Sequence, residues 1–230
     1  LASDLNRMVL AASDVSSRYS RRGPSEYEKI VDYICRVVEG KKGNYMVFCP
    51  SYQYLHAIED ILAAREASGA LSFIWNAQTN HMTEEDREAF LQSFEEERDC
   101  SMAALCVMGG IFSEGIDLMG EKLIGAIIIG TGLPQIGTER EILRQYYDKK
   151  GVNGFDYAYR YPGMNKVLQS AGRVIRTQED TGIILLLDER FAGKDYRNLF
   201  PAEWSDRGNC TLNTVEEQLG SFWNRIREKS

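Results

Sequence analysis

Short runs of consecutive apolar residues recur along the chain and predict buried β-strands. A strand with one face in water alternates apolar and polar residues, whereas these runs are continuous, which is typical of strands covered on both faces. The five predicted strands are residues 45–49, 71–75, 102–108, 123–129 and 182–187. Even the run from Leu123 to Ile129 is much shorter than the ~20 apolar residues that a membrane-spanning helix needs, so no membrane segment is expected.

Apolar residues at helical spacing fill the stretches between these runs. Ser25 and Glu28 have the spacing of a capping box, and the helix that they would open ends at Gly40. Thr83 and Asp86 resemble another helix start. The other predicted helices cover residues 51–67, 84–97, 138–150 and 163–176, with a last one after Thr214. Residues 6–22 are expected to form an extended lead-in that a Gly-Pro turn closes.

Strands that alternate with helices predict an α/β fold. Because each predicted strand is apolar throughout, the sheet should be mostly parallel and doubly wound, with helices on both faces. The sequence shows no internal repeat, and its 230 residues suit one such domain. We therefore expect a single domain over residues 1–230.

The composition excludes disordered and low-complexity proteins, because 43% of the residues are hydrophobic and 10% are aromatic. At first sight the net charge of −7 argues against a nucleic-acid partner. However, the stretch from Glu84 to Asp99 holds eight acidic residues against two arginines, and so contributes −6 of that charge. The rest of the chain is close to neutral, and the charge no longer argues against nucleic acid.

The five cysteines and two histidines do not form a metal or disulfide pattern. The cysteines are scattered, and none belongs to a Cys-x-x-Cys pair, which indicates reduced intracellular thiols. Two histidines are too few to support a histidine-rich metal centre. No signal peptide is recognisable at the start of the chain. We therefore expect a cytoplasmic protein without metal ligands and without a membrane partner.

Three segments that follow predicted strands contain small and polar residues. They are residues 50–52, 109–117 and 130–134. Ligands of open parallel sheets bind at the carboxyl ends of the strands. These segments are therefore candidates for a binding site.

A further candidate lies on the predicted helix 163–176. Gln169, Arg173 and Arg176 are four and then three residues apart, a spacing that puts side chains on one helix face. Gly172 removes a side chain beside that face, which would let a phosphate or another backbone approach. Two guanidinium groups with an amide before them suit a polyphosphate. The alternative is a solvated or salt-bridged arginine pair.

The arginine pair belongs to a longer pattern. Gln-x-x-Gly-Arg-x-x-Arg at 169–176 is followed by Asp180-x-Gly182 and by an apolar strand that ends in Leu-Asp-x-Arg-Phe at 187–191. This pattern resembles motif VI of superfamily 2 helicases, in the branch that contains DinG and XPD. Three more segments resemble parts of that branch: motif V at 112–117, motif IV at 47–52, and the strand that opens the second motor lobe at 15–22. The resemblance covers roughly residues 15–200, in the family's order.

The resemblance implies a RecA-like fold and the function of the second motor lobe of an ATP-dependent DNA helicase. In that family two RecA-like lobes bind ATP in the cleft between them and track along single-stranded nucleic acid. Arg173 and Arg176 would then stabilise charge on the transferring phosphoryl group as arginine fingers, and Gln169 would couple the nucleotide to lobe closure. The other nucleotide-binding residues would be Gly172, Gly115 and Asp117.

The same resemblance implies that Ser51, Tyr52 and Ser113 contact single-stranded DNA. An aromatic residue in such a place can stack on a base. Other interpretations stay open: Ser51 is equally typical of a helix N-cap, Tyr52 of a half-buried core residue, and Asp117 of an N-cap or turn. The tyrosine-rich segment 138–162 could present aromatic rings to DNA or pack against the neighbouring helix.

The chain lacks the motifs of the first lobe. It contains no Gly-x-x-x-x-Gly-Lys-Ser/Thr loop and no Asp-Glu-x-His or Asp-Glu-x-Asp box after a strand. ATP and Mg²⁺ would therefore be held by lobe 1 of the same polypeptide, and this chain alone would be inactive. Because its first residue is Leu rather than Met, we expect a fragment of a larger protein.

Two other functions stay open. One is a non-catalytic nucleic-acid-binding or regulatory module derived from a helicase lobe, which the missing upstream motifs would suit if Leu1 were the natural start. The other is a Rossmann-type nucleotide-binding enzyme. That function is disfavoured because no Gly-x-Gly-x-x-Gly follows a strand, and the Leu-Pro pair after Gly132 would end rather than open a helix.

Overall fold

One parallel sheet organises the molecule. The computed structural model describes residues 6–113, 123–177 and 179–229. Within these ranges seven strands pair in the order β3-β4-β2-β5-β6-β1-β7, and all the paired strands run parallel. The strands are β1 (Arg7–Ala12), β2 (Asn44–Cys49), β3 (Ile74–Ala77), β4 (Met102–Val107), β5 (Gly125–Ile129), β6 (Gly182–Leu187) and β7 (Gly208–Cys210).

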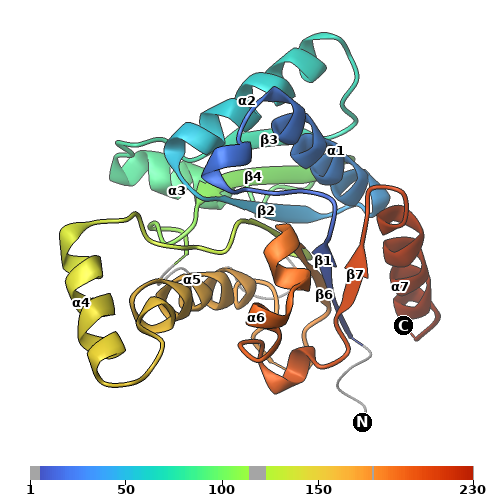
Figure 1. Cartoon of the computed structure of the whole chain (residues 1–230). Helices are drawn as coiled ribbons and strands as arrows, with labels where there is room; N and C mark the ends of the chain where they lie inside the picture. The colour runs from blue at the N-terminus through green and yellow to red at the C-terminus, as the bar shows by residue number, and fades with distance from the viewer. Residues whose placement is uncertain (1–5, 114–122, 178, 230) are drawn as a thin grey trace.

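Helices cover both faces of this sheet. They are α1 (Pro24–Gly40), α2 (Tyr52–Ala67), α3 (Glu84–Gln92), α4 (Thr138–Lys149), α5 (Tyr161–Ala171), α6 (Lys194–Arg197) and α7 (Val215–Lys229). Helices α1, α2 and α7 pack on one face, while α3, α5 and α6 pack on the other (Figure 1). Successive strand residues divide between these two cores: Val47 and Ile127 face the first, whereas Phe48 and Ile128 face the second. Burial on both faces explains why the strands are continuously apolar.

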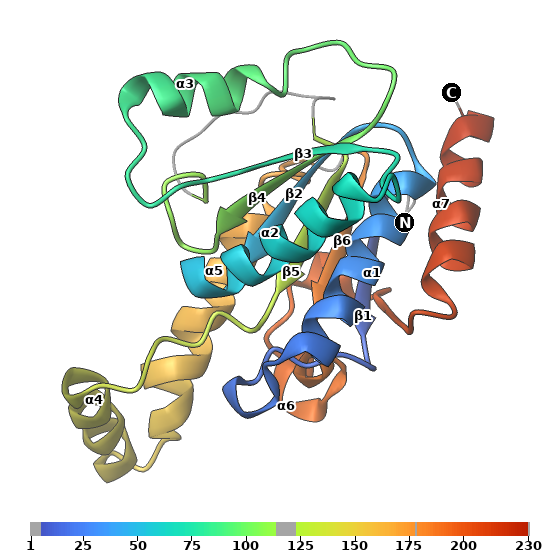
Figure 2. The same ribbon diagram turned by 90° about the horizontal axis from the view of Figure 1, so that it is seen from above.

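Helix α4 stands away from the sheet, as both views show (Figures 1 and 2). None of its residues is buried. It leads into a π-helical turn (Asp156–Arg160) that continues as α5. The tyrosines of this region contact one another: Tyr147 stacks on Tyr157 with ring centroids 4.3 Å apart, and the Tyr159 hydroxyl donates to Glu141 at 2.6 Å. These tyrosines therefore hold the projecting segment together.

The first strand lies earlier than the sequence indicated. Strand β1 occupies Arg7–Ala12, inside the predicted lead-in, and pairs with β6 and β7. Residues 15–22, which resemble the strand that opens the second lobe, form a loop with a 3₁₀ turn at Tyr19–Arg21 instead. The β1 run is short, begins with Arg7 and ends in two alanines, so its burial between two neighbours could not be read from its pattern.

Several element boundaries also differ from the prediction. The predicted strand 71–75 lies at Ile74–Ala77, and the helix expected to reach Glu97 ends at Gln92. Strand β7 was not predicted, because three residues carry too little pattern. The capping box at Ser25 is wrong, since α1 starts at Pro24 with Gly23 as N-cap and no side-chain cap. The capping box of Thr83 with Asp86 is confirmed.

Among the residues that the structure describes, no helix is both long and apolar enough to cross a membrane. In the same part of the chain, no group of three or more His, Cys, Asp or Glu side chains is arranged to hold a metal ion.

Candidate functional site

The turns that follow five of the strands meet at one edge of the sheet and enclose a pocket of about 780 Å³. The pocket is lined by segments after β1, β2, β4, β5 and β6, together with α5. We call it the carboxyl-edge pocket. The lining residues that matter below are Ser17, Arg18, Tyr19, Arg22, Ser51, Gln53, Thr131, Gln135, Ile136, Lys166 and Arg190.

The turn after β5 packs closely against the start of α5. Gly130 and Gly132 have φ values of +92° and +68°, which favour glycine because a Cβ is strained there. A Cβ on Gly132 would lie 2.5 Å from the carbonyl oxygen of Gly163, and one on Gly163 would lie 2.5 Å from that of Thr131. The two backbones therefore touch directly, which fixes Thr131 in the pocket wall.

The segment after β2 opens helix α2 beside the pocket. Ser51 is the N-cap of α2, and its hydroxyl accepts a hydrogen bond from the backbone N–H of Tyr54 at 3.2 Å. This confirms the N-cap interpretation, while Ser51 also lines the pocket. Tyr52 is half-buried, and its hydroxyl accepts from Gln78 Nε2 at 2.8 Å and donates to the Thr79 carbonyl at 3.3 Å. Its hydroxyl is therefore directed towards the end of β3.

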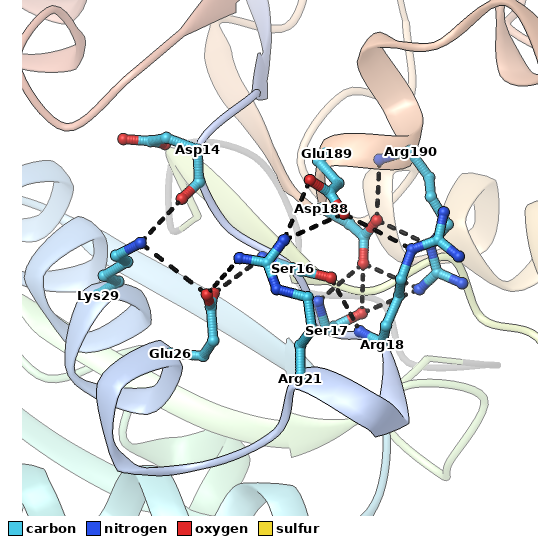
Figure 3. Close-up of polar contacts among 10 residues, drawn as sticks. All are labelled: Asp14, Ser16, Ser17, Arg18, Arg21, Glu26, Lys29, Asp188, Glu189 and Arg190. Carbon is cyan, nitrogen blue, oxygen red and sulfur yellow. Dashed lines mark hydrogen bonds and ion pairs between the residues drawn. The ribbon is translucent and has the colours of Figure 1, made fainter.

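A buried carboxylate joins the segments after β1 and β6 (Figure 3). Asp188 is fully buried and accepts hydrogen bonds from the Ser17 amide at 2.9 Å and the Ser17 hydroxyl at 2.5 Å. It also accepts from Nε and Nη2 of Arg190 at 2.8 and 2.9 Å. Burial alone would raise the pKa of Asp188, but the bonds and charge of Arg190, together with the Ser17 hydroxyl, outweigh burial and hold that pKa below its usual range. Arg190 is thereby held at the pocket.

A second set of charged side chains lies beside the Asp188 carboxylate (Figure 3). Arg21 pairs with Glu26 at 2.8 Å and with Glu189 at 3.3 Å. Glu26 also accepts from the backbone N–H of Ser16 at 3.0 Å. The loop after β1 is therefore fixed by side chains from α1 and from the segment after β6.

The structure brings the motif V and motif VI segments together. Arg173 donates from Nε and Nη2 to the carbonyl oxygen of Ser113, at 3.2 and 2.7 Å. Ser113 is fully buried, and its hydroxyl accepts from the Gly109 amide at 3.0 Å and lies 3.4 Å from the Val107 carbonyl. Its side chain is thus occupied inside the protein. Gly115 and Asp117 lie outside the described residues.

The arginines do not share a helix face with Gln169, which corrects the prediction. Gln169 is exposed on the last turn of α5, but this helix ends at Ala171, and the chain turns through Gly172 and Arg173. The turn brings Val174 into the core. A Cβ on Gly182, the first residue of β6, would lie 2.5 Å from Cγ1 of Val174, so Val174 fills the space that the glycine leaves.

Arg176 follows this turn and is exposed. The carboxylate of Asp180 accepts the backbone N–H groups of Arg176 and Thr177, both at 2.7 Å. Burial opposes ionisation of Asp180, yet these hydrogen bonds hold its pKa below the usual value. The backbone of Arg176 is therefore held in place while its side chain lies at the surface.

A smaller pocket of about 330 Å³ lies at this end of α5. Arg176 and Gly172 line it together with Arg7, Glu203 and Trp204. We call it the α5-end pocket. Arg7 is the first residue of β1 and pairs with the first residue of β6, so this pocket is near the amino ends of these strands. Six strand residues span ~20 Å, and the two pockets therefore lie towards opposite ends of β1.

Comparison with known protein families identifies the family of this chain. The model of the helicase C-terminal domain family matches residues 34–207. The chain belongs to that family. The RecA-like α/β fold and the resemblance to the C-terminal lobe of DinG- and XPD-like helicases are thereby confirmed. The structure of this helicase C-terminal domain also resembles that of apo XPD, with a TM-score of 0.71 and 19% identity over 90% of this chain and 40% of that chain.

Curated relatives of this helicase C-terminal domain are named as helicases. A probable ATP-dependent helicase of Methanocaldococcus jannaschii is 24% identical over 81% of this chain and 29% of its own length. The XPD helicase subunit of Schizosaccharomyces pombe is 27% identical over 86% of this chain and 26% of its own. The DNA helicase DinG of Photobacterium profundum is 33% identical over 49% and 16%. This chain matches less than a third of the length of each of these relatives.

The structure adds site residues that the sequence did not reveal. Arg7 lines the α5-end pocket from a strand far from motif VI in the sequence. Lys166 and Arg190 line the carboxyl-edge pocket beside Thr131, which belongs to the candidate segment 130–134. Arg190 was visible as part of the Asp-x-Arg pattern and Lys166 precedes Gln169 on α5, but only the fold places both at one pocket.

Proposed function

We propose that this chain is the second motor lobe of an ATP-dependent DNA helicase. The proposal rests on the arrangement at the end of α5. There Arg173 donates hydrogen bonds to the motif V segment, and Arg176 is exposed beside Gly172. Membership of the helicase C-terminal domain family supports it. The chain has no phosphate-binding loop or acidic magnesium box, so ATP and Mg²⁺ would be held mainly by a first lobe of the same polypeptide.

The donors at the α5-end pocket suit a polyphosphate. Arg176 and Arg7 line it with one acidic residue, Glu203, and a guanidinium binds phosphate oxygens through two parallel N–H groups. Arg176 is the arginine finger in this proposal, because it is exposed and can reach a nucleotide on another lobe. It stabilises the charge that develops on the transferring phosphoryl group, an effect of ~10³–10⁵ in rate where fingers have been removed.

Arg173 has a different part in this proposal. Its two hydrogen bonds to the Ser113 carbonyl tie the end of α5 to the segment after β4. A movement of one segment is therefore transmitted to the other, which couples the nucleotide to the nucleic acid. Gln169, Gly172, Gly115 and Asp117 complete the nucleotide side, with Gly172 leaving room for a phosphate.

The carboxyl edge of the sheet provides the track for single-stranded DNA. Ser51 lies there at the N-terminus of α2, and Tyr52 follows it. Basic side chains of the neighbouring loop, Arg18 and Arg22, face the same pocket. Cations and helix N-termini attract phosphates. Ser113 contributes through its backbone link to Arg173, since its hydroxyl is buried.

ATP hydrolysis by the full-length helicase that contains this chain tests the proposal. The rate is measured with and without single-stranded DNA for the wild type, Arg176→Ala and the control Arg227→Ala, which removes an exposed arginine from α7. We expect DNA to raise the wild-type and control rates, and Arg176→Ala to lose ~10³-fold or more. If Arg176→Ala keeps the DNA-stimulated rate, the finger assignment is wrong. If the wild type binds DNA without turnover, the chain is a non-catalytic binding module.

A further inference from the structure

A buried glutamine joins segments that are far apart in the sequence. Gln78 directly follows β3 and is 3% exposed. Its Oε1 accepts the backbone N–H of Val107 at 3.0 Å, and its Nε2 donates to the hydroxyl of Tyr52 at 2.8 Å. Because a backbone N–H only donates, the orientation of this amide is fixed. Glutamine is mostly exposed in proteins, and a buried one with both ends bonded holds its partners in one geometry.

The same glutamine supports the turn that follows β4. Val107 is the last residue of that strand, and its carbonyl oxygen accepts the N–H of Gly110 at 3.1 Å. A Cβ on Gly110 would lie 3.0 Å from that carbonyl oxygen and 3.4 Å from Nε2 of Gln78. The turn therefore lies directly against the Gln78 side chain, and a shift of one moves the other.

This turn leads to the carbonyl oxygen that Arg173 binds. The N–H of Ser113 donates to the carbonyl of Gly110 at 2.9 Å, and the Ser113 hydroxyl accepts from the N–H of Gly109 at 3.0 Å. The Ser113 carbonyl in turn accepts both bonds from the Arg173 guanidinium. One hydrogen-bonded series therefore runs from Tyr52, at the start of α2, to Arg173, after the end of α5. We call it the Gln78 series.

The two ends of the Gln78 series lie at the two functional regions proposed above. Tyr52 belongs to the segment that provides the DNA track, and Arg173 belongs to the nucleotide side. Between them, Gln78 and Ser113 are buried, so neither side chain is placed to touch a ligand. Coupling between distant sites is carried by such packed and hydrogen-bonded chains, and energetic coupling between their members demonstrates it.

We propose that Gln78 is a positioning residue that couples Tyr52 to Arg173 through the turn after β4. DNA on the track then changes the position of Arg173 and thereby the rate of ATP hydrolysis. The proposal rests on the proposed function, which supplies DNA at one end of the series and ATP at the other. It assigns a role to a residue outside all the helicase motifs that the sequence revealed.

ATP hydrolysis by the full-length helicase, measured over a range of single-stranded DNA concentrations, tests this coupling. Gln78→Met keeps the length of the side chain but removes both of its hydrogen bonds. We expect the DNA-saturated kcat to fall about tenfold. The half-saturating DNA concentration should change by less than about twofold, because Gln78 touches no DNA. The control Gln92→Met makes the same change at an exposed glutamine of α3 and should match the wild type.

A second variant breaks the series without leaving a buried backbone group unpaired. Gln78→Met removes the acceptor of the Val107 N–H, which lowers stability as well. Tyr52→Phe removes only the hydroxyl that Gln78 binds and keeps the aromatic ring. It should melt close to the wild type and still lose about tenfold in DNA-saturated kcat. A purely structural glutamine would instead lower the melting temperature of Gln78→Met and leave the kcat of Tyr52→Phe unchanged.

The double variant Tyr52→Phe/Gln78→Met shows whether the two residues act as one unit. Both substitutions break the same series, so the double variant should have the kcat of the more impaired single variant. Independent effects would multiply to a loss of about 100-fold. Such a multiplied loss would overturn the coupling.

The coupling and the motor can fail separately. Wild-type kcat in Tyr52→Phe and Gln78→Met, while DNA stimulates the wild type and Arg176→Ala is inactive, would overturn the coupling and leave the proposed function standing. If Gln78→Met does not fold, the kcat of Tyr52→Phe decides alone. A wild type whose ATP hydrolysis does not respond to DNA would overturn both.

Discussion

The carboxyl-edge pocket and the α5-end pocket both present arginines, but they are built in different ways. At the carboxyl edge, Arg190 is held by a fully buried carboxylate, and turns from five strands supply the wall. At the end of α5, Asp180 holds only the backbone of Arg176, whose side chain is exposed. In our proposal the first site binds its ligand with residues of this domain, whereas the second meets a ligand that another lobe holds.

This difference has a physical reason. A site that binds its ligand alone gains from side chains that are already ordered, because less conformational entropy is lost on binding. A finger that must reach across a cleft has to stay exposed until the cleft closes. Substitutions at the carboxyl edge should therefore change stability or DNA binding, whereas substitutions at the end of α5 should change the rate of ATP hydrolysis.

The largest effect on stability is expected at the carboxyl edge. Asp188→Ala leaves the Arg190 guanidinium without its partner, and breaking a buried ion pair costs ~3–5 kcal/mol in the free energy of unfolding. Chemical denaturation of the chain measures this cost. Asp188→Asn keeps the shape and one acceptor, so it should lose less. Equal stability of Asp188→Ala and the wild type would contradict the role of Asp188 as the support of the pocket.

The Asp188 carboxylate should also make the stability of the folded protein depend on pH, and the direction of its lowered pKa fixes the sign of that dependence. The pKa of Asp188 is lowered in the folded protein, so its stabilising contribution is complete above the unfolded value of about 3.9 and is lost as the pH falls through the folded value. Below about pH 4 the wild type should therefore lose stability more steeply than Asp188→Asn. Parallel pH profiles of the two proteins would show that Asp188 makes no such contribution.

A smaller effect is expected for the link between the two regions. Arg173→Lys removes the forked pair of bonds to the Ser113 carbonyl but keeps the positive charge. Hydrogen bonds to charged groups contribute ~1.5–3 kcal/mol, so kcat for ATP hydrolysis by the full-length helicase should fall about 10- to 100-fold. Steady-state kinetics measure this loss, and an unchanged kcat would mean that charge alone matters at this position.

Asp180→Ala tests the backbone support of Arg176. The carboxylate accepts two amides near the surface, so the expected loss in kcat is about tenfold or less. Oligonucleotide binding at the carboxyl edge should not change, because Asp180 is at the other end of the sheet. A loss of DNA binding without a loss of kcat would reverse the assignment of the two regions.

The smallest expected effect separates a structural from a binding role at Ser51. Ser51→Ala removes the N-cap of α2 and should cost ~1 kcal/mol of unfolding free energy. Ser51→Asp keeps a capping oxygen but adds a negative charge beside the pocket. It should retain stability and weaken oligonucleotide binding. If both variants bind DNA like the wild type, Ser51 is a cap only.

The sequence predicted the sheet better than it predicted the site. Continuous apolar runs such as Gly182–Leu187 identify strands buried on both faces, and these strands imply the parallel fold. The first strand was not predicted, because Arg7–Ala12 begins with a charged residue and ends in two alanines. Its place in the sheet between β6 and β7 depends on long-range pairing, which no local pattern contains.

The arginine motif was recognised, but its geometry was not. Periodicity placed Arg173 and Arg176 on one helix, whereas that helix ends at Ala171 and Val174 packs against Gly182. Arg7 stayed unnoticed because it joins its site through contacts between distant segments, whereas Thr131 was predicted only as part of the candidate segment 130–134. Local propensity therefore identified the residue types, while tertiary contacts decided which of them meet.

The most direct test of two separate sites is the ATP hydrolysis rate of the full-length helicase as a function of single-stranded DNA concentration. It is measured for the wild type, Arg176→Ala and Ser51→Asp. We predict that Arg176→Ala loses its maximal rate while the half-saturating DNA concentration stays the same. Ser51→Asp should instead raise the half-saturating DNA concentration. An Arg176→Ala enzyme that keeps the wild-type maximal rate would contradict the account.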